Sequence, residues 1–271
     1  MKACIALFCL CLHNGLLLAA EPTAAELKDF QETKAKAEKG DAKAQYNLGV
    51  MYADGQGVAK DEAVAVKWYR KAADQGDTEA QNDLGNMYAG GKGVVKDAAE
   101  AVKWFRKAAD QGDAFVQDKL GFMYKLGIGV AKDEAEAVKW YRKAADQGKA
   151  SAQLDLGFMY ARGEGVVKDA AEAVKWFRKA AEQGYAGAQF NLGVMYQYGR
   201  GIEKDYAEAY AWYNLVAKTD ELASKNRDAL EKQMTAAQVA EAQKRTKELR
   251  AMIDEARKAK VEAQKKAPAK P

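Results

Sequence analysis

Recurring carboxylate pairs are the residues best suited to chemistry. An aspartate and a glutamate stand three residues apart in four places: Asp97 and Glu100, Asp133 and Glu136, Asp169 and Glu172, and Asp205 and Glu208. A glycosidase uses two such groups on either side of the bond it cleaves. The same spacing suits the first turn of a helix, where the pair forms a carboxylate version of the capping box. Nothing marks one pair out from the others, so helix capping is the main interpretation and a glycosidase pair is the alternative.

Glycine-rich loops are the second chemical signal, because Gly-x-Gly segments hold phosphates in some proteins. The segment Gly55-Gln56-Gly57 has counterparts at intervals of 36 residues. No Gly-Lys-Ser or Gly-Lys-Thr follows any of them, so we interpret them as turns between helices.

Thiol and imidazole groups are confined to the start of the chain. All three cysteines and the single histidine, His13, precede Ala20. Lys2, an apolar stretch and the small residues Ala19-Ala20 are typical of a secretory signal peptide, so we expect cleavage near Ala20. An uncleaved membrane anchor is the alternative. The mature chain would then hold no thiolate or imidazole for catalysis or metal binding, and we expect neither cofactor nor metal.

These features lie on a 36-residue repeat. All five tryptophans follow it: Trp68, Trp104, Trp140, Trp176 and Trp212. A period of this length is the mark of a repeat array. At 48% apolar residues and a net charge of +4, the chain can bury a core and is not a general polyanion binder.

Each unit predicts two helices. In the first unit, an apolar stripe predicts a helix over about residues 42–53, and Gly49 would let a neighbouring helix come close beside Tyr52. Asp61 would cap a second helix that ends at Gly76. The residues expected to be buried on this second helix are Ala65, Trp68, Tyr69, Ala72 and Ala73. Short helix pairs bury their apolar faces by stacking, so we expect an all-α fold, an α-solenoid of helix-turn-helix repeats with helical caps.

We expect five parts along the chain. They are a signal peptide (1–20), an N-terminal capping helix (21–39), five repeats (40–219), C-terminal capping helices (220–260) and a disordered basic tail (261–271). The apolar stripe expected to cover the last repeat consists of Ala242, Thr246, Leu249, Ile253 and Ala256.

The repeat also resembles a known family. The run Ala-Gln-x-x-Leu-Gly-x-Met-Tyr, then Gly-x-Gly-Val, Lys-Asp and Ala-x-x-Trp-Tyr/Phe-Arg-Lys-Ala-Ala resembles the Sel-one-like repeats, which are related to tetratricopeptide repeats. The resemblance covers residues 40–219, and the fifth copy departs at Tyr210-Ala211 and Asn214-Leu215. It implies a right-handed superhelix and an exported bacterial adaptor or scaffold, periplasmic or secreted, that is not an enzyme.

Resemblance to tetratricopeptide solenoids also implies that the first helix of each pair lines a concave wall. Positions that vary between copies on that wall are candidate partner-binding residues: Tyr46, Val50, Phe115, Asp118, Phe122, Lys125, Leu154, Phe158 and Phe190. Such a wall suits an apolar peptide or an amphipathic helix of a protein partner. The alternative is that these side chains pack against the next helix of the wall.

Two other functions remain as alternatives. A cysteine-rich branch of the family has penicillin-binding or β-lactamase activity attributed to it. This chain lacks those cysteines, and neither Ser151 nor Ser224 begins a Ser-x-x-Lys motif. The other alternative is a secreted protein that binds a host protein.

The C-terminus is basic. Residues 244–271 carry ten Lys or Arg against four Asp or Glu, which suggests contact with anionic envelope material or a solvated helix with a frayed tail. We expect no nucleic-acid partner and no membrane span after signal cleavage.

Overall fold

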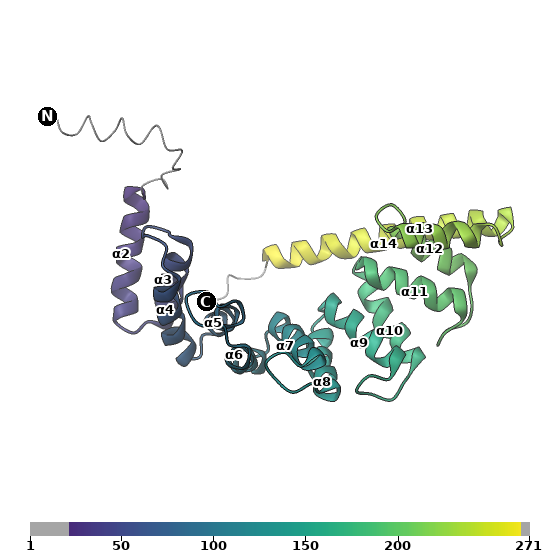
Figure 1. Ribbon diagram of the computed structural model, residues 1–271. Helices are drawn as coiled ribbons and strands as arrows, with labels where there is room; N and C mark the ends of the chain where they lie inside the picture. The colour runs from purple at the N-terminus through teal and green to yellow at the C-terminus, as the bar shows by residue number, and fades with distance from the viewer. Residues whose placement is uncertain (1–21, 267–271) are drawn as a thin grey trace, which may run out of the picture. The chain divides into compact units, whose positions relative to one another are not determined.

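Helices make up the regular structure of residues 22–266, which are the residues that the computed structural model describes (Figure 1). The predicted signal peptide and the last part of the predicted tail, 267–271, lie outside this range. Within it, no helix is both long and apolar enough to span a bilayer. The all-α prediction is therefore confirmed for the described residues.

The predicted helix pairs are present in all five repeats. The first helices are α3 (Ala42–Asp54), α5 (Thr78–Gly90), α7 (Ala114–Leu126), α9 (Ala150–Arg162) and α11 (Ala186–Tyr198). The second helices are α4 (Glu62–Asp74), α6 (Ala98–Asp110), α8 (Glu134–Asp146), α10 (Ala170–Glu182) and α12 (Tyr206–Val216). Helix α2 (Ala24–Glu38) precedes them, and α13 (Glu221–Glu231) and α14 (Ala236–Lys266) follow. The helix predicted over 42–53 is one residue longer than expected.

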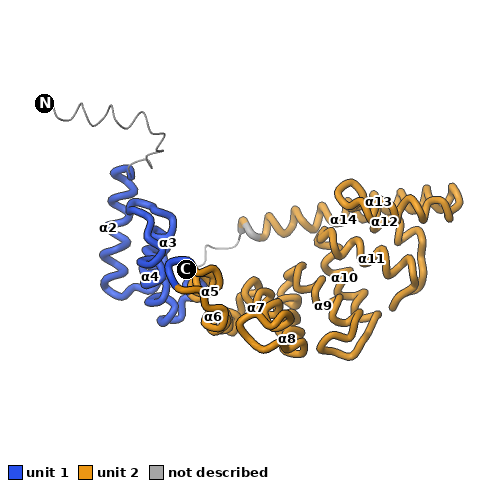
Figure 2. The backbone as a smooth tube through the Cα atoms, viewed as in Figure 1, with its two compact units in different colours: residues 1–80, 92–94 blue, residues 81–91, 95–271 orange. Residues whose placement is uncertain are grey.

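The chain forms two compact units (Figure 2). Of the described residues, the first comprises 22–80 and 92–94, and the second 81–91 and 95–266. In the first unit, Phe30 and Ala37 of α2 pack with Leu48 and Met51 of α3. In the second unit, α7 packs on α8, α9 on α10 and α11 on α12. Each unit therefore has its own buried core.

Aspartates begin the second helices, as predicted. The carboxylates of Asp97, Asp133, Asp169 and Asp205 accept hydrogen bonds of 2.9–3.0 Å from the backbone N–H three residues on. The paired glutamates differ from the expected capping box, because they turn to side chains of their own helix. Glu100, for example, accepts from Lys103 and from the indole of Trp104. The reciprocal capping box occurs instead before α2, at Thr23 and Glu26, where it was not predicted.

A glycine in each first helix admits an aromatic ring. A Cβ built on Gly121 would lie 2.8 Å from Cδ1 of Tyr141, and Gly49 has the same relation to Tyr69. The expected close approach of a neighbouring helix is therefore confirmed, and the contact is made by an aromatic ring of the second helix in the same repeat. The ring rests directly on the backbone, which fixes the distance between the paired helices.

The Gly-x-Gly loops are turns, as the sequence indicates. Gly127 ends α7 in the left-handed conformation and donates its N–H to the carbonyl of Met123. Gly129, at φ +68°, faces the backbone of Ala98 so closely that an added Cβ would come within 3.0 Å of it. Close packing against the backbone of the preceding repeat thus explains why the second position of the Gly-x-Gly loop is a glycine. No bound phosphate is needed to account for it.

Buried glutamines connect successive repeats. Gln117 of α7 is only 4% exposed and donates to the carbonyl of Ala109, at the end of α6. Its own oxygen accepts from Gln147, at the end of α8. Gln153 makes the same two bonds one repeat later, to Ala145 and from Gln183. This link supplies the polar partners that a buried amide needs.

Removing that link is expected to cost stability. Replacing Gln117 by Leu should lower the unfolding free energy by about 1–2 kcal/mol, because two hydrogen bonds are lost at a buried position. Gln189→Leu is a matched control, since Thr219 stands where the other repeats have the second glutamine. Thermal unfolding followed by circular dichroism measures both. If both variants lose the same unfolding free energy, the hydrogen bond from Gln147 to Gln117 does not contribute to stability.

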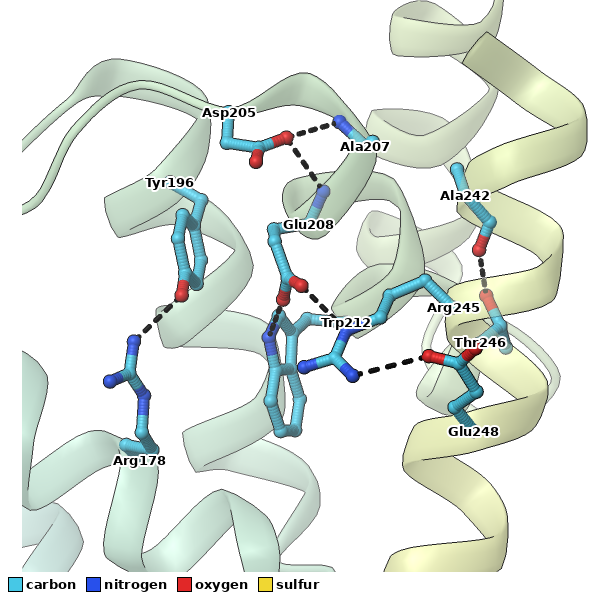
Figure 3. A network of polar contacts seen from close by, with 10 residues as sticks. All are labelled: Arg178, Tyr196, Asp205, Ala207, Glu208, Trp212, Ala242, Arg245, Thr246 and Glu248. Atoms are coloured by element: carbon cyan, nitrogen blue, oxygen red, sulfur yellow. Dashed lines mark hydrogen bonds and ion pairs between the residues drawn. The ribbon is translucent and has the colours of Figure 1, made fainter. Parts of the chain in front are cut away.

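Helix α14 attaches to the last repeat through a polar network (Figure 3). Arg245 donates to Glu208 of α12 at 2.6 Å and reaches Glu248 at 3.4 Å. Glu208 also accepts from the indole of Trp212 at 3.1 Å, and Thr246 donates to the carbonyl of Ala242. The network lies beside the apolar contacts of α14 with α12 and fixes where α14 crosses it.

Several details differ from the sequence-based expectations. Four members of the predicted α14 stripe are buried, but Ala256 is exposed, and beyond it Arg257 contacts the protein through a hydrogen bond to the carbonyl of Gly184. Trp68 is half-buried, while Ala65, Tyr69, Ala72 and Ala73 are buried. Helix α14 continues to Lys266, six residues past the expected boundary at 260.

Candidate functional site on helix α7

A pocket of about 630 Å³ opens on helix α7 in the second unit. Phe115 and Phe122 line it and are 71% and 49% exposed. They lie seven residues apart, or two helical turns, and so stand on one face of α7. Leu126 extends the same face and is 53% exposed. Three large apolar side chains thus lie in the open on one helix, which makes this face a candidate interaction surface.

Charged groups surround these rings. The ammonium of Lys149 lies 3.5 Å from the centroid of the Phe115 ring. Asp118 accepts a 2.6 Å hydrogen bond from the hydroxyl of Ser151. Lys119 donates to Asn82 at 3.2 Å and to Asn86 at 2.7 Å. The pocket therefore combines aromatic faces with groups of both charges, which suits a peptide better than a uniformly apolar ligand.

Burial shifts the ionisation of the pocket groups. It raises the pKa of Asp118 above 3.8, although the hydrogen bond from Ser151 and the charge of Lys149 oppose this. It also raises the pKa of Asp155, whose opposing influence is Lys125 at 3.5 Å. Burial lowers the pKa of Lys119. These charges are held in a partly dehydrated site, where a ligand's charge would be felt strongly.

Neutralising Asp118 is expected to stabilise the protein near neutral pH. Because folding raises the pKa of this carboxyl, the folded state holds its proton more tightly than the unfolded state. Its ionisation therefore lowers the free energy of unfolding as pH rises above 3.8. Asp118→Asn should therefore raise Tm by about 1–2 °C at pH 7 and leave it unchanged at pH 3. Ser151→Ala should act in the opposite direction, because it removes the hydrogen bond to the carboxylate. A Tm gain that is the same at both pH values would refute the explanation.

The structure brings only part of the predicted surface together. Phe115, Asp118 and Phe122 line the pocket, and Lys125 lies beside them as the ionic partner of Asp155. Phe158 is half-buried and packs edge-on against Phe177, with ring centroids 5.2 Å apart. The other half-buried members pack on cores: Leu154 on that of α10 and α11, Phe190 beside Tyr213, and Tyr46 beside Tyr69. Val50 is half-buried in the first unit.

Six pocket residues were not among the predicted site residues: Asn82, Asp113, Val116, Lys119, Lys149 and Asp155. Lys119 and Asp155 occupy the same position in successive repeats, one residue after the predicted Asp118 and Leu154. Lys119 stands four residues after Phe115 and three before Phe122, so it lies on the same face of the helix. Including every residue at helical spacing of three, four or seven would therefore have found this position. Lys149 stands at the start of α9, and its reach over Phe115 was not visible in the sequence.

A family model decides what these repeats are. The Sel1 repeat model matches five consecutive segments: 42–77, 78–113, 114–149, 150–185 and 186–218. The chain belongs to the Sel1 repeat family. The expected resemblance and the α-solenoid fold are thereby confirmed. Proteins built of Sel1 repeats generally serve as scaffolds for protein–protein interaction.

One solved structure supports this assignment, and the chain is also similar to others. A Sel1 repeat protein from Oxalobacter formigenes is 39% identical, with a TM-score of 0.65 over 71% of this chain and 82% of that chain. A protective antigen of uropathogenic Escherichia coli strains, which displays the same kind of fold, is 26% identical, with a TM-score of 0.40 over 91% and 76%. Cysteine rich protein B of Helicobacter pylori is 25% identical, with a TM-score of 0.40 over 49% and 97%. Among curated proteins, no sequence matches significantly.

Proposed function

We propose that this Sel1 repeat protein is an exported scaffold that binds a protein or peptide partner through helix α7. The observation that carries the proposal is the exposure of Phe115 and Phe122 in one pocket. At the position of Phe115, the other four repeats have Lys, Glu, Ser or Gly. The buried residues of the third repeat follow the pattern common to all repeats. Its core therefore does not require an aromatic ring at position 115.

Export follows from the sequence of the first twenty residues, and we place the protein in the bacterial periplasm or outside the cell. The basic end of the chain, including the exposed Lys258 and Lys260, is a second contact for anionic envelope material. Binding to a host protein after secretion is the alternative within the same class of function.

The test of the proposal is identification of a partner that binds stoichiometrically. Immobilised protein would be incubated with an envelope extract, and retained proteins identified by mass spectrometry. The strongest candidate would then be purified and titrated calorimetrically. A saturable 1:1 complex that survives 150 mM salt supports a scaffold function. If no retained protein binds in purified form, the proposal fails.

Enzymatic activity toward β-lactams is the alternative from another class. The described residues hold no group of three acidic, histidine or cysteine side chains placed to bind a metal. Ser151, one of the two serines after Ala20, donates its hydroxyl to Asp118 and has no lysine three residues on. We expect no covalent labelling of the purified protein by a fluorescent penicillin, and stoichiometric labelling would overturn this expectation.

A further inference from the structure

Two equivalent positions touch across neighbouring first helices. Between α5 and α7 they hold Asn82 and Lys119, whose side chains form a 3.2 Å hydrogen bond. One repeat later, between α7 and α9, the same two positions hold Asp118 and Asp155. A favourable pair of acceptor and donor is thus replaced by two carboxylates, which repel each other.

The chain compensates this pair only in part. Ser151 donates to Asp118, on which the charge of Lys149 also acts, and Lys125 reaches Asp155 at 3.5 Å while also lying 3.9 Å from Glu164. The charge of Asp118 adds to burial in raising the pKa of Asp155. A further cation placed between the two carboxylates would remove their repulsion.

A buried hydroxyl near the pair has no partner. Tyr141 of α8 is fully buried, and its hydroxyl makes no hydrogen bond within the described residues. The charges of Asp155 and Asp118 both raise the pKa of this hydroxyl, which places it in their field, although burial is the larger cause. The equivalent residues of the neighbouring repeats are Phe105 and Phe177, which have no hydroxyl to satisfy. A hydroxyl accepts hydrogen bonds as well as donating them, so a cation bound beside the two carboxylates would supply a donor that this hydroxyl lacks.

The aromatic rings stand beside these groups on the same helix. Phe122 follows Asp118 by four residues, or about one turn, so its ring and the carboxylate share one face of α7. Phe115 already accepts a cation on its ring face, from Lys149. The two ammonium groups of the pocket are therefore engaged, Lys119 by asparagines and Lys149 by this ring. Carboxylates next to exposed aromatic rings are the chemistry that recognises a long cationic side chain.

We propose that Asp118 and Asp155 bind a lysine or arginine side chain of the partner, whose aliphatic stem lies on Phe122. This inference rests on the proposed function, because it names the group that the pocket on α7 recognises. Arginine fits best, since its planar guanidinium can contact both carboxylates at once.

The test is a selection from a random 12-residue peptide library on the immobilised full chain. We expect the retained peptides to share a Lys or Arg at a fixed position. Synthetic peptides then carry either that residue or uncharged norleucine. The norleucine change should weaken binding at least tenfold to the native protein and less than twofold to Asp118→Asn/Asp155→Asn. A control variant, Asp110→Asn/Asp146→Asn, changes two exposed aspartates on second helices and should behave like the native protein.

The outcomes separate the two proposals. Peptides without a shared basic residue that still lose binding in Phe115→Ser/Phe122→Ser would overturn the cation site and leave the groove in place. Equal norleucine penalties for the native and the Asn variant would overturn the cation site as well. If the native protein retains no peptide from the library, both the cation site and peptide binding on α7 fail. Unchanged Tm of the Asn variant, or the rise expected above, shows that it is folded in these measurements.

Discussion

Replacing Phe115 and Phe122 together by serine is expected to weaken partner binding at least tenfold and to leave the fold intact. The rings are the large exposed apolar groups of the pocket, and truncating a central aromatic contact typically costs more than 2 kcal/mol of binding free energy. Folding depends on them little, because Phe115 is 71% exposed and Phe122 49%. Tm should therefore fall by less than about 4 °C.

Phe158→Ser provides the matched comparison. Its ring packs against Phe177 in the core of the second unit, so its loss should lower the unfolding free energy by about 2–3 kcal/mol. Calorimetric titration with the purified partner and thermal unfolding measure the two effects separately. A large fall in Tm for Phe115→Ser/Phe122→Ser, with binding unaffected, would show that these rings serve the fold and not a partner.

Gly129→Ala is expected to destabilise the array strongly. The new Cβ would meet the backbone of Ala98 closer than 3.0 Å, and backbone cannot move aside as a side chain can. The φ of +68° adds strain for any residue other than glycine. We expect a loss of roughly 3 kcal/mol in unfolding free energy, or about 6–12 °C in Tm.

Gly112→Ala separates packing from backbone strain. Gly112 has φ +99°, but nothing lies within 4 Å of the position of its Cβ. Its substitution should therefore cost only the conformational strain, about 1 kcal/mol. Circular dichroism melts of both variants compare them directly. If Gly129→Ala is as mild as Gly112→Ala, the Gly-x-Gly loops are not packing elements, and a ligand-binding role for them would need to be considered again.

Periodicity was enough to predict the helix pairs of the repeats. Regular glycines mark the turns and aspartates most of the helix starts, although α9 and α11 follow Lys149 and Tyr185 without a side-chain cap. Gly121 illustrates the limit of this reasoning: the pattern predicts a close neighbour, but only the structure identifies it as the ring of Tyr141. The glutamates of the Asp-x-x-Glu pairs were assigned the wrong partners, because indole and ammonium groups on the same helix compete with the backbone for them.

The site could be predicted only in part, because equivalent positions acquire different environments. Phe122 and Phe158 are 36 residues apart, each within the same run Leu-Gly-Phe-Met-Tyr, yet one is exposed and the other packs on a ring. The neighbours decide the difference. Around α7 the adjoining helix offers Asn82 and Asn86, which engage Lys119, whereas around α9 Leu154 continues the apolar cluster. Contacts of this kind depend on pairs of repeats and not on the sequence of one.

The most direct test of partner binding on α7 is site-specific photocrosslinking in cells. A photoreactive amino acid would replace Phe122, and in a second strain Lys103, which is exposed on helix α6. We expect a single dominant protein adduct from position 122, reduced at least tenfold by Phe115→Ser, and none of that adduct from position 103. The same adduct from both positions, or an adduct from position 103 alone, would contradict the assignment of the binding site to helix α7.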